Sequence, residues 1–390
     1  MLILHVAAHY YPTAAGVPEV VGHISRRLAD WGHEVHVATG RPAGSQAEEL
    51  RAGVHIHRFK VEGGGMVRPH GDISGYLDFV RSRPWDVVVL HSAQAWVTDV
   101  LLPHVSGLPS AVIFVGHGLL TLDEAAHTEY WSWFAESLRH VDASTTLSPL
   151  LQETPFCAKY NLPRPQVIPN GVDTSEWATP SLGIRQQWKI GESPWLVNVS
   201  NHTPVKAHAS YFSAVDWVSK TLPTVRGTIV GNSHRAHAWR LGRLGVKGGC
   251  WYRCQLQARH DPHVDLRSNV ARADVVSAIK EADVLVLTSP RGREGSPIVI
   301  LEAMAAGTPW LSFGAGCVQE HAGGLIVSDL DEMVEKLHVL LGDHQFRHSL
   351  GRAGRMRIIE KHSWDAVVRQ YEQLYRDAVA RRAAVATENV

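Results

Sequence analysis

Residues 293–310 read R-E-G-S-P-I-V-I-L-E-A-M-A-A-G-T-P-W, and this stretch decides the fold more than any other part of the chain. An apolar run at 284–288 comes just before it and predicts a buried strand. Ser296 is a favourable N-cap residue, and Pro297 suits the first position of a helix. We therefore expect a strand, a loop and a short helix over 298–306, which the following Gly-Thr-Pro ends.

Two carboxylates, Glu294 and Glu302, lie on either side of this strand-to-helix junction. Pro297 stops them from sharing one continuous helix, so Glu294 belongs to the loop and Glu302 lies about a turn and a half inside the helix. The free N–H groups of a helix N-terminus bind anions, and carboxylates beside it can accept hydrogen bonds from sugar or ribose hydroxyls. The predicted ligand is a sugar attached to phosphate; the alternative is a capped helix with two solvated carboxylates.

The composition indicates large apolar cores and a balanced charge. Of 390 residues, 45% are hydrophobic and 13 are Trp, and this length suggests two or three domains. Lys+Arg and Asp+Glu both number 38, so we expect no basic face for nucleic acid and no nucleic-acid partner. The neutral balance argues against strong binding to an anionic membrane but leaves weak peripheral membrane contact open. An apolar strand at 2–6, with no basic leader before it, favours a cytoplasmic protein over a secreted one.

Apolar strands alternate with amphipathic helices along most of the chain. Val20, Val21, Ile24, Leu28 and Trp31 recur at helical spacing after the first strand. This rhythm predicts an α/β protein with parallel, doubly wound sheets. No G-x-G-x-x-G follows the first strand and no P-loop string occurs, which disfavours a nicotinamide dehydrogenase or an ATPase. Further strands are expected at 35–38, 87–91 and 111–115, and a second α/β unit begins at 195–199 and continues with strands at 228–230, 284–288 and 310–312.

The four cysteines have no regular spacing, which argues against a disulfide framework. Cys250 and Cys254 are followed by His260 and His263, and these residue types can ligate zinc. However, 24 histidines make chance proximity common, and this histidine pair is closer than in usual finger spacing. We favour reduced thiols and surface histidines, and we expect no metal site.

The string from Glu294 to Pro309 resembles the E-x7-E motif of retaining GT-B glycosyltransferases, in particular the GT4 family. Four shorter strings match the same family in order, and together they span nearly the whole chain: Y-P-x-x-x-G-V-P-E at 11–19, G-H-E-V at 32–35, I-P-N-G-V-D at 168–173 and S-W-D at 363–365. The resemblance implies a GT-B fold, with two Rossmann-like doubly wound domains facing a central cleft.

The resemblance also implies the domain boundaries. Residues 1–166 form an N-terminal Rossmann-like acceptor domain, which a C-terminal helix at 365–385 completes. Residues 167–176 form the interdomain linker, where Pro, Asn and Gly together favour a rigid turn. Residues 177–364 form the C-terminal Rossmann-like domain that binds the nucleotide sugar.

The function implied is that of a retaining, hexosyltransferase-type glycosyltransferase. It would move a sugar from a nucleoside-diphosphate sugar, a UDP- or GDP-sugar, to a hydroxyl of a saccharide, a lipid-linked sugar or a small natural product. No cofactor and no metal are required in this family's mechanism. The acceptor attacks from the face that the diphosphate leaves, so the protein acts mainly by positioning groups and stabilising charge.

Three residues carry the chemistry that the resemblance implies: His117, facing the donor sugar, with Glu294 and Lys206. GT4 enzymes place an arginine and a lysine on the donor diphosphate; Lys206 matches the lysine, but Asn201 occupies the arginine position. His202, Arg291, Arg293 or the helix dipole would have to supply the missing charge. The family has Gly-Gly where this chain has Ala15-Gly16. The donor-binding set implied is Gly16, Asn201, Lys206, Glu294, Gly295, Ser296, Pro297, Ile298 and Glu302.

Other functions remain open at this point. The main alternative among enzymes is a GT-B-fold sugar-nucleotide epimerase or phosphorylase, although a phosphorylase would need a pyridoxal-binding lysine context that this sequence does not show. The alternative outside enzymes is a non-catalytic protein that binds nucleotide sugars. A hydrolase with a Glu–Glu pair is disfavoured because Glu302 is assigned to the ribose. The segment 119–134 follows His117 and is expected to shape the acceptor side; its aromatic residues could stack on sugars or pack a core, which we favour.

Overall fold

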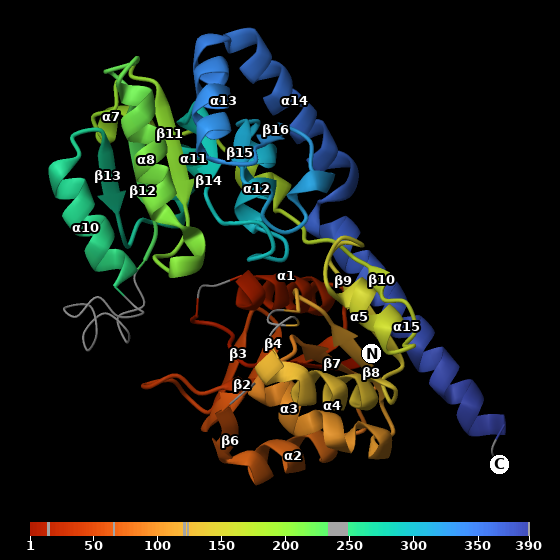
Figure 1. The fold of residues 1–390 in the computed structure, drawn as a ribbon. Coiled ribbons are helices and arrows are strands. Elements are labelled where there is room, and N and C mark those ends of the chain that lie inside the picture. The colour runs from red at the N-terminus through yellow and green to blue at the C-terminus, as the bar shows by residue number, and fades with distance from the viewer. Residues whose placement is uncertain (14–15, 65–66, 120–121, 123–124, 233–248, 389–390) are drawn as a thin grey trace. The chain divides into compact units, whose positions relative to one another are not determined.

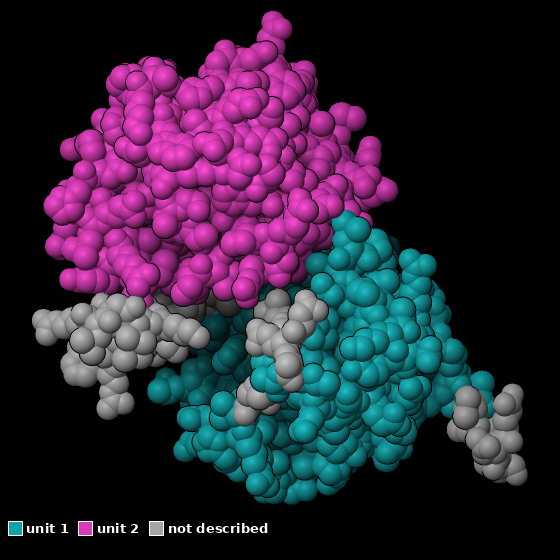
Figure 2. Space-filling model, in the orientation of Figure 1, with its two compact units in different colours: residues 1–171, 364–390 teal, residues 172–363 magenta. Residues whose placement is uncertain are grey.

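A computed structural model describes the chain apart from residues 14–15, 65–66, 120–121, 123–124, 233–248 and 389–390. The chain divides into two compact units, shown in Figure 2. Unit 1 comprises Met1–Gly171 and Trp364–Val390, and unit 2 comprises Val172–Ser363. Among the described residues, none of the helices combines the length and apolar character needed to cross a membrane.

Unit 1 is built on an eight-stranded sheet in the order β10-β9-β8-β7-β1-β2-β4-β3. Neighbouring strands are parallel except for β3, which pairs antiparallel with β4 at one edge. The strands are β1 (Leu2–Ala7), β2 (Glu34–Gly40), β3 (Glu48–Arg51), β4 (Val54–Phe59), β7 (Val87–His91), β8 (Ala111–Val115), β9 (Ala143–Thr146) and β10 (Gln166–Val167). A separate hairpin pairs β5 (Val61–Gly64) with β6 (Val67–Gly71).

Helices cover both faces of this sheet, because right-handed crossovers in opposite directions place them on opposite sides. In Figure 1, α1 lies on one face, and α2, α3 and α4 lie on the other. Helix α15 packs on α1 and β8, although it follows unit 2 in the sequence. The helices are α1 (Gly16–Asp30), α2 (Ile73–Arg81), α3 (Trp96–Leu101), α4 (Thr128–Leu138), α5 (Glu153–Lys159) and α15 (Trp364–Glu388).

The alternation of side chains along the strands separates two layers of core. Leu4 belongs to a cluster with Trp131 and Phe134 on one face. His5 points to the other face, where its ring meets Tyr375 of α15. The preference for a core role therefore holds for Trp131 and Phe134, whereas Trp133 is 37% exposed.

Unit 2 is built on a six-stranded, wholly parallel sheet in the order β13-β12-β11-β14-β15-β16. Helices α8 and α13 pack together on one face, and α11 and α12 pack together on the other. Its strands are β11 (Trp195–Val199), β12 (Arg226–Val230), β13 (Val264–Arg267), β14 (Val284–Leu287), β15 (Trp310–Ser312) and β16 (Gly324–Ile326). Its helices are α6 (Thr174–Ala178), α7 (Ile184–Gln187), α8 (His208–Ser219), α10 (Cys250–His260), α11 (Arg272–Glu281), α12 (Ile298–Ala306), α13 (Leu330–Gly342) and α14 (His344–Lys361).

The predicted linker 167–176 is more structured than a simple turn. Its first residue ends β10, and its last residues lie in α6. The division between the units falls inside it, after Gly171. A Cβ on Gly171 would lie 2.6 Å from the ring of Trp364, so only glycine fits at this position.

Candidate functional site

The most promising site in unit 2 lies where the strand order reverses, between β11 and β14. In open parallel sheets such a switch point at the carboxyl ends of the strands is where ligands bind. The loop after β11 carries Lys206, and the loop after β14 carries Glu294. The two residues meet there: the Lys206 Nζ donates to Glu294 Oε2 over 2.7 Å. The fold thus brings together two predicted site residues that are far apart in sequence.

This ion pair is largely shielded from solvent, and it uses only one of the two carboxylate oxygens of Glu294. The side chains of Lys206 and Glu294 are 22% and 13% exposed. Thr288 Oγ1 donates to the carbonyl of Lys206 over 2.8 Å, which fixes the lysine loop on the end of β14. Glu294 Oε1 is buried and has no hydrogen-bond partner among the described residues. A buried carboxylate oxygen without a donor is costly, so it is well suited to accept a ligand hydroxyl.

The cap of helix α12 differs from the prediction, although the helix begins at Ile298 as expected. The N-cap is Pro297, with φ −69° and ψ 107°, and no side chain caps the helix. The assignment of Ser296 as N-cap is therefore wrong, because Pro297 stays extended and itself occupies the cap position. Gly295 is held instead through its carbonyl, which accepts from Cys317 N over 2.9 Å. The end of the helix agrees with the prediction, since Gly307 adopts the left-handed conformation with φ 76°.

Glu302 is buried in α12 and is held by an arginine that the sequence analysis missed. Its Oε1 lies 2.6 Å from an Nη of Arg272, the first residue of α11. The same guanidinium binds both carboxylate oxygens of Glu176 at 2.8 and 2.7 Å. One cation therefore orients two carboxylates, which fixes the side chain of Glu302 before any ligand arrives. No local motif marks Arg272, because its partners come from α6 and α12.

Asn201 has a different use from the arginine that it replaces. Its Oδ1 accepts from Asn232 N over 3.1 Å, and Asn232 Oδ1 accepts from Asn269 N over 2.7 Å. Asn201 therefore ties together the loops that follow β11, β12 and β13. His202, one suggested substitute for the missing charge, is only 5% exposed.

In unit 1 the predicted residues Gly16 and His117 follow β1 and β8 respectively. Gly16 begins α1 and is exposed, and a Cβ on it would meet nothing within 4 Å. Local crowding therefore does not require glycine at position 16, which the resemblance assigns to donor binding, and Ala15 beside it lies outside the described residues. His117 is half-buried, and burial lowers the pKa of its imidazole to about 4.

His117 ends a string of three hydrogen-bonded imidazoles. Its Nε2 lies 3.1 Å from His91 Nδ1, and His91 Nε2 lies 2.9 Å from His5 Nδ1. Burial lowers the pKa of His5 to about 3 and that of His91 well below its usual range. All three rings are therefore neutral at pH 7. The two ring nitrogens that take no part in these bonds are the buried His5 Nε2 and His117 Nδ1, and of the two residues only His117 is partly exposed, so its Nδ1 can meet a ligand. Sequence reasoning missed this string, because a lone His inside an apolar strand gives no sign of its neighbours.

Glu153 holds the loop around His117 through a hydrogen bond to its backbone. It is 2% exposed, and its Oε1 accepts from Gly118 N over 2.7 Å. Burial raises the pKa of this carboxyl. A Cβ on Gly116 would lie 2.6 Å from Glu153 Oε1, which explains the glycine before His117. Glu153 is therefore a positioning residue for the histidine.

The sequence matches the models of two glycosyltransferase families. Residues 14–176 match the family described as Glycosyltransferase Family 4, and residues 193–343 match Glycosyl transferases group 1. A GDP-mannose-dependent alpha-(1-6)-phosphatidylinositol monomannoside mannosyltransferase of Mycobacterium tuberculosis is 26% identical over 235 residues. This alignment covers 56% of this chain and 57% of the mycobacterial protein, so the chain matches little more than half of that relative.

Two solved structures resemble the fold along nearly its full length. The sucrose-phosphate synthase of Thermosynechococcus elongatus has a TM-score of 0.78 at 19% identity, with 97% of this chain and 99% of that chain covered. The Anabaena protein HepE in complex with UDP-glucose has a TM-score of 0.75 at 16% identity, with 96% and 99% covered. At these identities the likeness concerns the fold.

Proposed function

Because the chain belongs to the GT4 family of GT-B glycosyltransferases, we propose that it transfers a sugar from a nucleoside-diphosphate sugar to a hydroxyl acceptor with retention of configuration. The observation that carries this proposal is the pair of Lys206 and Glu294 at the switch point of unit 2. The cation suits a diphosphate, and the unpartnered Oε1 of Glu294 suits a hydroxyl of the donor sugar.

The other residues of unit 2 take roles around this pair. The N-terminus of α12, with Gly295, Ser296, Pro297 and Ile298 leading into it, places N–H groups near the phosphates. Glu302, held by Arg272, accepts hydrogen bonds from the ribose hydroxyls. With Asn201 in the arginine position, Lys206 and the helix dipole carry most of the charge stabilisation.

In unit 1 we assign to His117 the role that the resemblance implies. As a neutral imidazole at pH 7, it donates a hydrogen bond from Nδ1 to a sugar hydroxyl, since Nε2 is engaged with His91. Transfer then needs no group that titrates near neutrality, and in our proposal it needs no catalytic metal. The departing phosphate oxygen takes the proton of the acceptor hydroxyl.

We propose a UDP- or GDP-sugar as donor. The mycobacterial relative is named for GDP-mannose, and HepE is described with UDP-glucose. For the acceptor we propose a saccharide, a lipid-linked sugar or a small hydroxylated natural product; the relative is named for a phosphatidylinositol mannoside.

The test is a panel of α-linked UDP- and GDP-sugars incubated with hydroxyl acceptors of these three classes. We expect transfer, and proton NMR of the first-formed product should show an α linkage. A β linkage would refute retention while leaving transfer intact. Binding with neither transfer nor donor hydrolysis would instead indicate a non-catalytic binding protein, and a change of the sugar nucleotide without acceptor would indicate an epimerase.

Replacing Glu302 by alanine should weaken binding of the free nucleoside diphosphate by about 1.5–3 kcal/mol, the range for hydrogen bonds to charged groups. Arg272 keeps Glu176 as a partner, so the fold should survive the change. Calorimetric titration measures the affinity, and the exposed Glu192→Ala is the matched control. Unchanged affinity in a folded Glu302→Ala protein would remove this carboxylate from the nucleotide site.

A further inference from the structure

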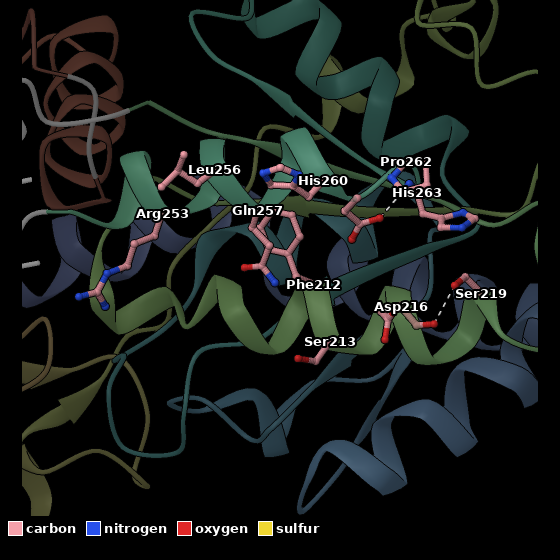
Figure 3. Close-up of a pocket in the computed structure, with 11 residues that line it drawn as sticks. Phe212, Ser213, Asp216, Ser219, Arg253, Leu256, Gln257, His260, Pro262 and His263 are labelled. Atoms are coloured by element: carbon pink, nitrogen blue, oxygen red, sulfur yellow. Dashed lines mark hydrogen bonds between the residues drawn. The ribbon is translucent and has the colours of Figure 1, made fainter. Parts of the chain in front are cut away.

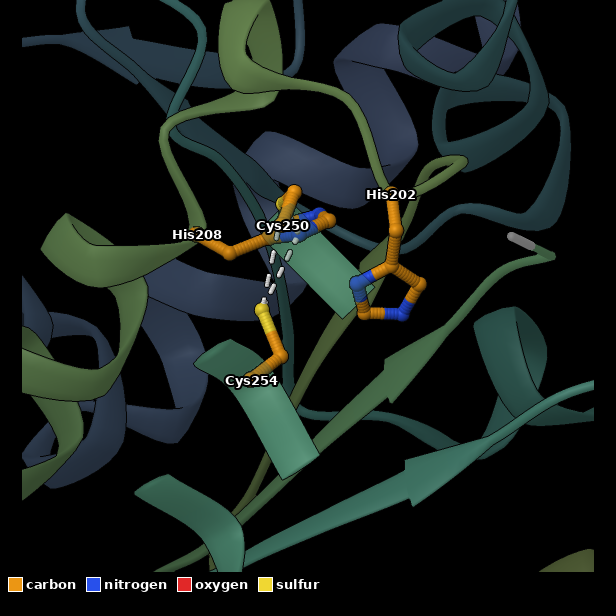
Figure 4. Close-up of side chains that lie close together, drawn as sticks. All are labelled: His202, His208, Cys250 and Cys254. Carbon is orange, nitrogen blue, oxygen red and sulfur yellow. Dashed lines mark hydrogen bonds between the residues drawn. The ribbon is translucent and has the colours of Figure 1, made fainter. Parts of the chain in front are cut away.

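Four side chains in unit 2 form a compact cluster that the proposed transfer does not use. The ligand atoms of His202, His208, Cys250 and Cys254 all lie within 4.8 Å of one another, as Figure 4 shows. His202 comes from the loop after β11, and His208 begins α8. Cys250 begins α10, and Cys254 lies one turn further along the same helix. All but Cys250 are fully buried.

The spacing of these atoms fits a tetrahedral metal ion. The two Sγ atoms lie 4.0 Å apart, and His208 Nδ1 lies 3.6 and 3.7 Å from them. With Zn–S bonds of about 2.3 Å and Zn–N bonds of about 2.0–2.1 Å, tetrahedral angles require about 3.8 Å between sulfurs and about 3.5 Å between nitrogen and sulfur. The thiols are not joined as a disulfide.

The surroundings of His208 set its tautomer for metal binding. Ser200 Oγ donates to Asn198 Oδ1 over 2.6 Å, because the Asn198 amide nitrogen already donates to the carbonyl of Val286. The serine proton is thus engaged, so Ser200 Oγ accepts from His208 Nε2, 2.8 Å away. Nδ1 therefore carries the lone pair and faces the sulfurs. Such an outer hydrogen bond is the usual support for a histidine that ligates a metal.

His202 points to a missing partner more directly. Its side chain is 5% exposed, yet neither ring nitrogen has a hydrogen-bond partner among the described residues. Its ring packs edge-on against those of His208 and Trp251, with centroids 4.6 Å away in both cases. Buried polar groups are nearly always satisfied, so an imidazole without a partner beside two thiols calls for a further ligand.

We propose that His202, His208, Cys250 and Cys254 bind one zinc ion in a structural site. Two thiolates and two imidazoles in tetrahedral arrangement select zinc, and four protein ligands leave no open position for catalysis. His260 and His263, which follow these cysteines in the sequence, are not among the four ligands. They line a separate groove between α8 and α10, as Figure 3 shows.

The site would act on the loop that carries Lys206. The two histidines lie at either end of residues 203–207, so a bound ion would hold both ends of this segment. Within it, Ala207 has φ 46°, a left-handed conformation that disfavours residues with a Cβ. A fixed loop would keep the Lys206 ammonium group beside the Glu294 carboxylate. The ion would thereby help donor binding, a consequence that rests on the proposed function.

Metal analysis of the full-length protein, purified with zinc in the medium and dialysed, tests the site. We expect one zinc per chain, and its loss in Cys254→Ser. Cys157→Ser, which removes a buried free cysteine of unit 1, and His263→Ala should both keep the ion. No zinc in the wild-type protein, zinc retained by Cys254→Ser, or zinc lost from His263→Ala would each overturn the proposal.

If Cys254→Ser does not fold, cobalt replacement in the wild-type protein decides the question. We expect the intense visible bands of tetrahedral Co²⁺ together with thiolate charge-transfer absorption. A weak octahedral spectrum, or a Cys250–Cys254 disulfide found by peptide mass spectrometry, would refute the site. These readouts do not involve transfer, so zinc bound to an inactive protein would count only against the proposed function.

Discussion

Replacing Lys206 by alanine is expected to reduce sugar transfer by about two to three orders of magnitude, the usual effect of removing one group that stabilises developing charge. The effect should be large because Asn201 leaves this lysine without the arginine that GT4 enzymes place beside it. The change also leaves Glu294 partly buried without its cation, so the affinity for the donor should fall as well. Steady-state kinetics with a saturating acceptor separates kcat from the donor KM.

Two matched variants make this result specific. Lys220→Ala removes an exposed lysine from the end of α8, and it should leave transfer unchanged. Lys206→Arg keeps the charge but changes the shape, so it should retain part of the activity. A Lys206→Ala protein that is folded and transfers sugar at the normal rate would refute the role of the lysine on the diphosphate.

Mild acid is expected to destabilise unit 1 through its buried histidines. The pKa of His5 falls from 6.5 to about 3 on folding, and that of His117 falls to about 4, in both cases through burial. Between these values and 6.5 the unfolded chain binds more protons than the folded one, so stability decreases as the pH falls below 6.5. His5 alone should lower the free energy of unfolding by about 3 kcal/mol between neutral pH and pH 4.

Urea unfolding at a series of pH values between 7.5 and 4.5 measures this loss. His5→Leu should make the free energy of unfolding depend less steeply on pH, since it removes one of the buried groups that become protonated on unfolding. Exposed His344 is the control, because His344→Gln should leave the slope as it is in the wild-type protein. A free energy of unfolding that stays constant over this range would show that the string of imidazoles does not resist protonation.

The fold class and the family are the part that sequence reasoning predicted best, and both are confirmed. Apolar runs such as 195–199 and 284–288 became central parallel strands because burial on both faces of a sheet leaves a continuous apolar pattern. Helix α12 appeared over the expected residues, since Pro297 and Gly307 mark its ends locally. The hairpin of β5 and β6 was not predicted, as its short, exposed strands carry little apolar signal.

The candidate site was predictable only where a local motif marked it. Lys206 and Glu294 were found through such strings, and the structure brings them together. Arg272, Glu153 and the string that ends at His117 depend on contacts between distant segments, and no spacing along the chain records them. For the cysteine pair, the sequence offered several histidines downstream, whereas the two that meet it lie upstream, on either side of Lys206.

The return of the chain to unit 1 through α15 has a consequence for biosynthesis. Unit 2 is one continuous segment, so it can fold as soon as residues 172–363 have left the ribosome. Unit 1 cannot, because Tyr371 and Tyr375 of α15 are buried and the latter meets His5. Most of unit 1 is therefore synthesised first, but its fold is completed last. Until α15 has been synthesised, the sheet face that this helix covers stays exposed, and we expect chaperones to bind there.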